Sequence, residues 1–131
     1  MTRGMSLIEL MIVLAVLGIL LTLAVPGYSS HMLRVHRTEA IRMLLKASMC
    51  QERIYAGRGH YDTSQCRPAS EHQRYEIAYA LADTQEQSFI ALARPLGAQL
   101  PDVCGSLLLD QSGARTISAA NVSAAKCWNG R

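Results

Sequence analysis

A single apolar run dominates the first part of the chain. Residues 5–25 carry one charge, that of Glu9, and the rest are almost all aliphatic or small. A helix advances about 1.5 Å per residue, so this run spans about 31 Å, which matches the hydrocarbon core of a bilayer. The pattern therefore predicts a membrane-crossing helix that begins near Met5.

The helical pattern resumes after Pro26-Gly27 and continues to about Tyr55. Together the two stretches predict one N-terminal helix of about 50 residues, roughly 75 Å long. A proline inside a helix kinks or loosens it, so we expect such a feature at Pro26. The second half should bury one stripe of residues against a sheet, at Ile41, Leu44, Leu45, Ser48 and Tyr55.

Short alternating segments follow the helix, which we expect to break at residues 57–61, where Gly57 and Gly59 punctuate the chain. Runs bounded by Gly, Pro, Asn and Asp are typical of strands in an antiparallel meander. The predicted strands cover residues 74–79, 88–94, 106–110 and 114–118. A helix followed by consecutive strands predicts an α+β fold, with a long N-terminal helix packed on a small antiparallel sheet.

The length of 131 residues allows one domain. Only about 100 residues remain outside the apolar run, and a head of that size often needs a covalent staple. The four cysteines supply one.

Positive charge is concentrated just after the apolar run. Residues 30–60 hold six basic and two acidic residues, whereas from Tyr61 onward six basic residues meet seven acidic ones. This basic segment suits lipid headgroups, acidic neighbours or nucleic acid, and a solvated helix face is the plainer alternative.

Glu9 is the feature that a plain membrane anchor does not explain. A carboxylate inside an apolar helix is costly to bury and usually has a functional partner. The generic alternative is that Glu9 reaches the membrane interface from the start of the helix. A secretory signal peptide fits less well, because the apolar run is long and the segment around Pro26 is a poor cleavage site.

The segment Gly4-Met5-Ser6-Leu7-Ile8-Glu9 closely resembles the cleavage motif of type IV prepilins, although that family usually has Phe where this chain has Met5. The resemblance implies that residues 1–4 are a leader, and that prepilin peptidase cuts between Gly4 and Met5 and then N-methylates Met5. It also implies that Glu9 pairs with the methylated amine of a neighbouring subunit in a dry filament core, where either charge alone would be costly.

Other segments extend the resemblance to pilins. Gly18 and Pro26 fall where pilin helices commonly carry a helix-kinking glycine and proline, and the stretch from Cys104 to Trp128 is similar to the C-terminal half of PilE-type minor pilins. The expected division is a leader at 1–4, a transmembrane or filament-core helix at 5–25, an amphipathic half-helix at 26–56 and a periplasmic α+β head at 57–131.

Four cysteines allow three pairings. We favour Cys50–Cys66, which would tie the end of the helix to the next loop, and Cys104–Cys127, which would close a C-terminal loop as a disulfide does in type IV pilins. Free thiols and a zinc site are the alternatives, and the absence of a Cys-x2-Cys pair disfavours zinc.

No motif of a hydrolase, zinc protease or phosphate-binding loop occurs in the sequence, so we expect neither an enzyme nor a cofactor. The histidines are scattered and are most simply surface residues: His31, His36, His60 and His72.

The resemblance therefore implies a minor pilin that acts in pilus assembly, in a priming or tip complex, and that supports twitching motility, adhesion or DNA uptake. Its partners would be other minor pilins, the major pilin, prepilin peptidase with its N-methyltransferase activity, the inner-membrane platform of the pilus, and membrane lipid before assembly. It would start as a single-pass inner-membrane protein with a periplasmic head and end in the extracellular filament.

Two alternatives stay open beside this interpretation. A type II secretion pseudopilin shares the leader and Glu9. A ComP-like competence pilin would itself bind DNA, for which the candidate contacts are Arg58, Arg67, Arg74, Arg115, Lys126 and Arg131.

The distribution of basic residues conflicts with the expected topology. More arginines follow the apolar run than precede it, which by the positive-inside rule would place the head in the cytoplasm. We favour a periplasmic head, because an even number of cysteines in a small domain suits an oxidising compartment and the leader motif implies a cytoplasmic N-terminus.

Overall fold

The computed structural model describes residues 6–68, 73–81 and 86–130, which fall into two compact units, Met1–Met32 and Leu33–Arg131. The leader, with Gly4 and Met5, lies outside the described residues. The elements, in chain order, are α1 (Leu7–Arg58), β1 (Tyr75–Leu81), β2 (Phe89–Pro95), the 3-10 helix η1 (Gly97–Gln99), β3 (Leu107–Asp110), β4 (Arg115–Ile117) and α2 (Ala124–Trp128).

The predicted long helix is confirmed: α1 has 52 residues and continues through Pro26. The hydroxyl groups of Ser29 and Ser30 donate hydrogen bonds to the carbonyls of Pro26 and Gly27, each at 3.0 Å. The helix ends at Arg58 rather than near Tyr55, and the break falls at Gly59, whose φ of +75° leaves the helical region. The kink predicted at Gly18 and Pro26 stays a prediction.

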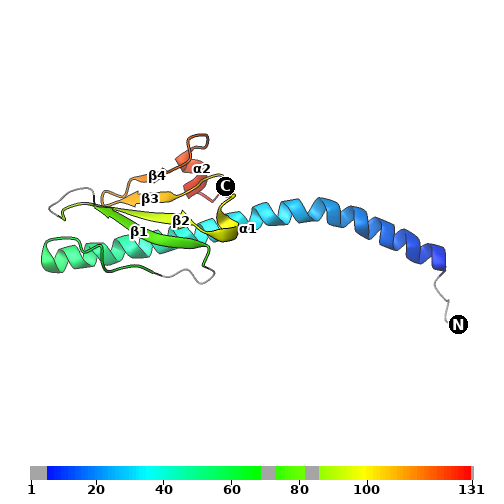
Figure 1. Ribbon diagram of the computed structural model, residues 1–131, viewed down its shortest axis with the longest axis horizontal. Helices are drawn as coiled ribbons and strands as arrows, with labels where there is room; N and C mark the ends of the chain where they lie inside the picture. Colours follow the sequence, from blue (N-terminus) through cyan, green and yellow to red (C-terminus); the bar gives the residue numbers. More distant parts are fainter. Residues whose placement is uncertain (1–5, 69–72, 82–85, 131) are drawn as a thin grey trace. The chain divides into compact units, whose positions relative to one another are not determined.

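All four predicted strands are present, with ends within two residues of those expected. They form one antiparallel sheet in the order β1-β2-β3-β4, a meander in which each strand pairs with the next along the chain (Figure 1). A continuous set of cross-strand partners runs through all four strands: Ala78, Leu92, Leu108 and Thr116. The α+β class and the expected arrangement, a long N-terminal helix with a small antiparallel sheet, are confirmed.

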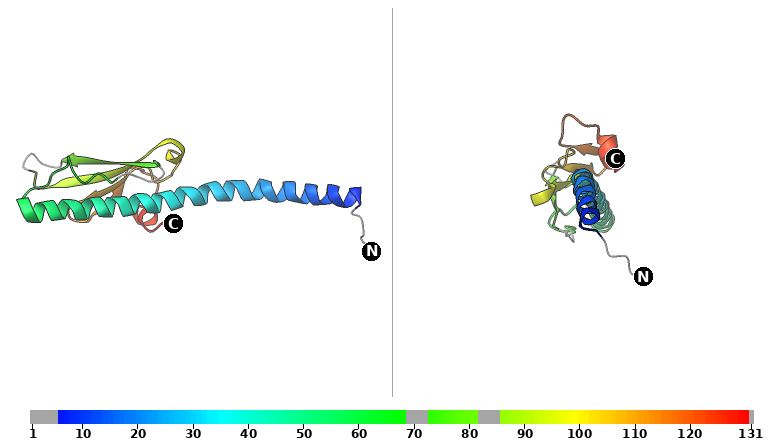
Figure 2. Two further views of the ribbon diagram at one scale, coloured as in Figure 1. Left: turned by 90° about the horizontal axis from the view of Figure 1, so that it is seen from below. Right: turned by 90° about the vertical axis from the view of Figure 1, so that its right-hand side faces the viewer.

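Within the unit that begins at Leu33, the sheet lies along the second half of α1 (Figures 1 and 2). The predicted stripe on α1 was partly wrong, because Leu45 and Tyr55 are 38% and 37% exposed. Of the predicted stripe only Leu44 is buried, and the buried residues of α1 are His36, Arg37, Ala40, Met43, Leu44, Ala47 and Gln51. Two alanines in this stripe let the sheet approach closely, and a search for large apolar residues overlooks them.

One predicted surface histidine is not on the surface. His36 is 8% exposed, and its Nδ1 lies 3.6 Å from a carboxylate oxygen of Glu39 one turn later. His31 is exposed and His60 is half-buried, while His72 lies outside the described residues.

A buried carboxylate, that of Asp102, holds the β2–β3 loop to α1. It accepts hydrogen bonds from both sides of the Arg37 guanidinium, at 3.0 Å from Nε, and from the hydroxyl of Tyr75 at 3.0 Å. Gln99 donates to Asp102 at 2.8 Å and to the carbonyl of Leu33 at 2.9 Å. Arg37, part of the basic excess in the sequence, is therefore 3% exposed and neutralised inside the head.

These contacts decide the charge state of the cluster. Burial alone raises the pKa of Asp102, but the hydrogen bonds from Arg37 and Cys104 and the charge of Arg37 outweigh it, so the pKa of Asp102 is lowered overall. Burial, together with the charge of Asp102, raises the pKa of Tyr75 far above its ordinary range. The cluster therefore holds one ionised carboxylate, one guanidinium and one neutral phenol at neutral pH.

Two disulfides staple the head, Cys50–Cys66 and Cys104–Cys127, which are the pairings favoured from the sequence. The first joins α1 to the loop that follows it, and the second joins the β2–β3 loop to α2. Cys104 also donates its backbone N–H to Asp102 at 3.0 Å, so the second disulfide and the buried cluster share a loop.

We expect Asp102→Asn to destabilise the head by about 3 to 5 kcal/mol, because it leaves a buried guanidinium without its counter-charge. Chemical denaturation of the full chain in detergent, followed by near-ultraviolet circular dichroism, measures this. Asp110→Asn is the matched control, since Asp110 accepts hydrogen bonds in the turn after β3, and should cost only about 1 kcal/mol.

The sign of the pH dependence follows from the lowered pKa of Asp102. Its contribution to stability is complete above the unfolded-state pKa of about 3.9 and is lost as pH falls toward the lower folded value.

A loss below 1 kcal/mol for Asp102→Asn would contradict the anchoring role.

Removal of one disulfide should lower the free energy of unfolding by about 3 kcal/mol in the chain-entropy model. The double variant Cys104→Ser with Cys127→Ser tests this against Cys50→Ser with Cys66→Ser, whose closed loop is of similar length. The first should cost more, since it also loosens the loop that carries Asp102. Equal losses would show that the cluster does not depend on the disulfide.

Candidate functional site

The N-terminal unit presents an apolar surface that the structure leaves uncovered. Among the described residues, α1 is the one helix long and apolar enough to cross a membrane, and its apolar window is 0% buried. Leu7 is 80% exposed and Leu23 72%. A surface of this kind requires lipid or other apolar helices around it.

Glu9 lies in the first turn of α1 and is exposed. A carboxylate at a helix N-terminus interacts favourably with the partial positive charge of the first backbone N–H groups. This position also leaves its oxygens accessible to a cation from another molecule.

Two loops of the head are joined at the end of α1. Tyr61 donates its backbone N–H to the carbonyl of Glu86 at 2.9 Å, and Gln87 donates to the carbonyl of Gly59 at 3.1 Å. Tyr55 donates its hydroxyl to Gln87 at 3.0 Å. The start of the α1–β1 loop and the segment before β2 therefore form one surface, which carries Arg58.

The α1–β1 loop is also fixed from inside. The side chain of Gln51, which is buried, donates to the carbonyl of Asp62 at 2.7 Å and accepts from its N–H at 3.0 Å. Tyr61 stacks edge-on against Phe89 and donates to Glu52 at 3.0 Å, and burial followed by this hydrogen bond raises the pKa of Tyr61 to about 12. A loop held this way presents its side chains in fixed positions.

A local carboxylate offsets the charge of Arg58. Its guanidinium lies 3.5 Å from an oxygen of Asp62. The hydroxyl and the backbone N–H of Ser64 lower the pKa of Asp62, so that this carboxyl group stays ionised. Arg58 is therefore a weak candidate for binding a phosphate.

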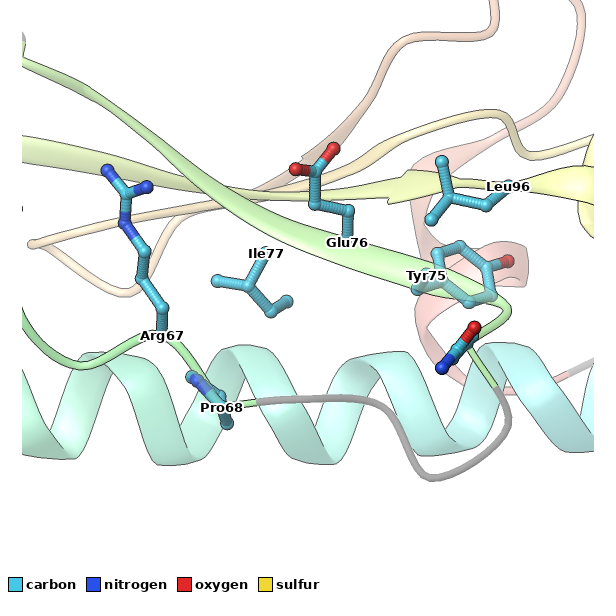
Figure 3. A pocket seen from close by; sticks show the side chains of 7 residues that line it. Arg67, Pro68, Tyr75, Glu76, Ile77 and Leu96 are labelled. Carbon is cyan, nitrogen blue, oxygen red and sulfur yellow. The ribbon is translucent and has the colours of Figure 1, made fainter.

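Arg67 lines a pocket of about 440 Å³ beside β1, to which Pro68, Gln73, Tyr75 and Leu96 also contribute. Figure 3 shows Arg67 on the loop side of this pocket and Glu76 and Ile77 on β1. The guanidinium of Arg67 donates to the carbonyl of Thr63 at 3.3 Å. The carboxylate of Glu76 makes the pocket less suited to an anion.

A second pocket, of about 270 Å³, lies between β4 and α2 and is lined by Arg115, Ala124, Ala125, Trp128 and Asn129. The guanidinium of Arg115 lies over the ring of Trp128, 5.3 Å from its centre, and the indole N–H donates to the carbonyl of Thr116 at 3.0 Å. None of the described residues that line it is acidic. Arg115 is thus the candidate whose described surroundings suit a phosphate best, and Lys126, which does not line the pocket, is exposed on α2.

The other candidates do not join this surface. Arg74 directly precedes β1, where its carbonyl accepts from Leu96 at 2.8 Å, and Arg131 lies outside the described residues. The sequence did not predict α2, although Ser123 was a usable signal: its side chain accepts from the backbone N–H of Lys126 and caps the helix. Arg37 was also missed as a structural residue, since its partner lies 65 positions away.

Comparison with protein families gives two matches. Residues 1–25 match the prokaryotic N-terminal methylation motif. Residues 26–108 match the family described as type IV minor pilin ComP, DNA uptake sequence receptor. No curated protein matches the chain.

Two solved structures are similar in fold. A type IV pilin from Shewanella oneidensis is 27% identical, with a TM-score of 0.56, and the match covers 70% of this chain and 98% of that one. The non-core minor pilin PilV from Neisseria meningitidis is 24% identical, with a TM-score of 0.55, over 72% and 95% of the two chains. The second shows the fold alone.

Proposed function

Because the chain belongs to the family described as type IV minor pilin ComP, DNA uptake sequence receptor, we propose that it is a pilus subunit whose head binds DNA. The observation that carries the proposal is the extent of the family match, residues 26–108, which includes the second half of α1, β1, β2 and the start of β3. On sequence alone, DNA binding ranked below a role in pilus assembly. The family match reverses that order.

Membership of the pilin family makes the chain a structural, non-enzymatic protein. A methylation motif at residues 1–25 and an exposed apolar helix fit a subunit that begins in a membrane and moves to a filament. The family also implies prepilin peptidase and pilus subunits as partners. The processing roles of Gly4 and Met5 are part of our proposal.

Within this proposal, DNA binds where cations are least neutralised. Arg37 is neutralised by Asp102, Arg58 faces Asp62, and Arg67 shares its pocket with Glu76. No acidic residue is among the described residues that line the pocket of Arg115, and Lys126 is exposed on the neighbouring α2. Phosphate contacts supply most of the affinity of non-specific DNA binding, so this C-terminal surface is the proposed contact.

The head suits double-stranded rather than single-stranded DNA. Single-strand binding relies on exposed aromatic rings on which bases stack. In the described part of the head only Tyr55 is more than a third exposed, at 37%, and its hydroxyl is held by Gln87. The other aromatic rings there are buried or half-buried: Tyr61, Tyr75, Tyr79, Phe89 and Trp128.

Assembly remains a role of the same chain, since a DNA-binding pilin must enter the filament to act. Glu9, exposed in the first turn of α1, can pair with the N-terminal amine of a neighbouring subunit. In an apolar bundle neither charge is tolerated alone, so the pairing would select correct axial register.

We expect replacing Arg115 and Lys126 together by Gln to weaken DNA binding about tenfold or more and to lower the slope of log K against log salt by about 2, since each phosphate contact contributes about 0.9 to that slope for B-DNA. A mobility-shift titration of the full chain in detergent with duplex DNA, repeated over a salt series, measures both quantities.

The control is the pair Arg42→Gln and Arg53→Gln, which removes the same charge from exposed positions on α1. The single variant Arg115→Lys should retain most of the slope of log K against log salt, because it keeps the charge at this position. Absence of binding by the parent chain at low salt would refute the DNA-binding function, and equal losses in both pairs would refute the assignment to the C-terminal surface.

Glu9→Ala should leave leader cleavage largely intact but reduce incorporation into filaments severalfold, because the neighbouring amine would be buried without a counter-charge. N-terminal sequencing of the membrane form and immunoblotting of sheared pili measure the two steps. Gly4→Ser, which removes the expected cleavage site, should block processing instead. Normal incorporation of the Glu9→Ala chain would contradict the charge pairing.

A further inference from the structure

The β2–β3 loop inverts the usual burial of side chains. Its polar residues are inside, with Gln99 1% and Asp102 5% exposed, while Leu100 is 67%, Val103 64% and Leu96 39% exposed. Burying an amide and a carboxylate is favourable only with full hydrogen bonding, and exposing leucine gains nothing in an isolated head. The pattern indicates that the outer surface of this loop meets an apolar medium.

The exposed side of the loop carries no charge. Residues 95–103 contain one ionisable side chain, that of Asp102, and it is neutralised from inside by Arg37. The remainder is proline, leucine, glycine, alanine and valine around the buried Gln99. Protein interfaces usually centre on aromatic residues or arginine and carry about one hydrogen bond per 100–200 Å². This aliphatic surface lacks both and suits lipid better.

The loop is also attached to the chain close to the membrane segment. Gln99 and Asp102 bind α1 at Leu33 and Arg37, and Leu33 follows Val25, the end of the apolar run, by eight residues. Eight residues reach at most about 27 Å even when fully extended, so the length of the chain alone limits how far the loop can lie from the bilayer surface. Arg34, exposed beside this anchor, can meet lipid phosphate.

We propose that the loop at residues 95–103 rests on the membrane surface before assembly, with Leu100 and Val103 inserted among the lipids. The proposal rests on the pilin-like membrane stage of the proposed function and is independent of DNA binding. The contact is intramolecular once α1 is inserted, so a small apolar surface suffices where a free partner would require a larger one. The loop would then hold the head at the bilayer until subunits are extracted.

Leu100→Trp in the full chain, reconstituted into phosphatidylethanolamine–phosphatidylglycerol vesicles that contain dibrominated phosphatidylcholine, tests the contact. Met49→Trp is the matched control, because Met49 is also 67% exposed but lies on α1, 16 residues beyond Leu33. That separation is about 24 Å of helix, so bromine should quench the tryptophan at position 100 at least about twofold more than that at position 49. Trp128, 6% exposed, is the common background.

Val103→Trp supplies a second reporter and should behave like Leu100→Trp. Equal quenching at positions 100 and 49 would overturn the proposal, because position 100 would then be no closer to lipid than the control position. A mobility shift on the same preparations keeps the outcomes separate, since loss of DNA binding would refute the proposed function and leave the lipid contact standing.

Discussion

The buried carboxylate of Asp102 is the constraint on which the rest of the head depends. Its partners come from α1 (Arg37), β1 (Tyr75), η1 (Gln99) and the loop before β3 (the backbone of Cys104). A buried ion pair gains little net stability over apolar packing, but its geometric demands are strict. Here they fix the position along α1 at which the sheet packs, and through Cys104 they also position the C-terminal disulfide.

The sequence was most informative where structure is local. Alternation predicted four strands, and the break between segments predicted the end of α1 to within three residues, because both signals come from neighbours in the chain. It failed where the partner is remote, since Arg37 and Asp102 are 65 positions apart, and it did not predict that His36 is buried. The prediction that Leu45 is buried was wrong for the same reason, since the face of α1 that is buried contains Ala40 and Ala47.

The candidate DNA contacts show why counting charges misleads. The basic excess lies on α1, yet the charge of Arg37 is paired with Asp102 inside the head and Arg58 faces an ionised Asp62. Residues 61–131 are nearly neutral in sequence, yet Arg115 lies over the ring of Trp128 with no acidic residue among the described residues that line their pocket. Which cation is available to a phosphate depends on local pairing, which only the folded chain reveals.

The same cluster also explains one of the exposed apolar surfaces in the described part of the chain. The helix before Val25 exposes aliphatic side chains because its partners are lipid or other helices, whereas Leu100 and Val103 are exposed because Gln99 and Asp102 turn inward to reach α1. An isolated soluble head would gain from the opposite arrangement, with the leucine buried and the carboxylate solvated. The inward carboxylate is therefore best understood together with the outward leucine: an ionised group on the outer side of this loop would be repelled from lipid, and the guanidinium of Arg37 removes that charge from the surface.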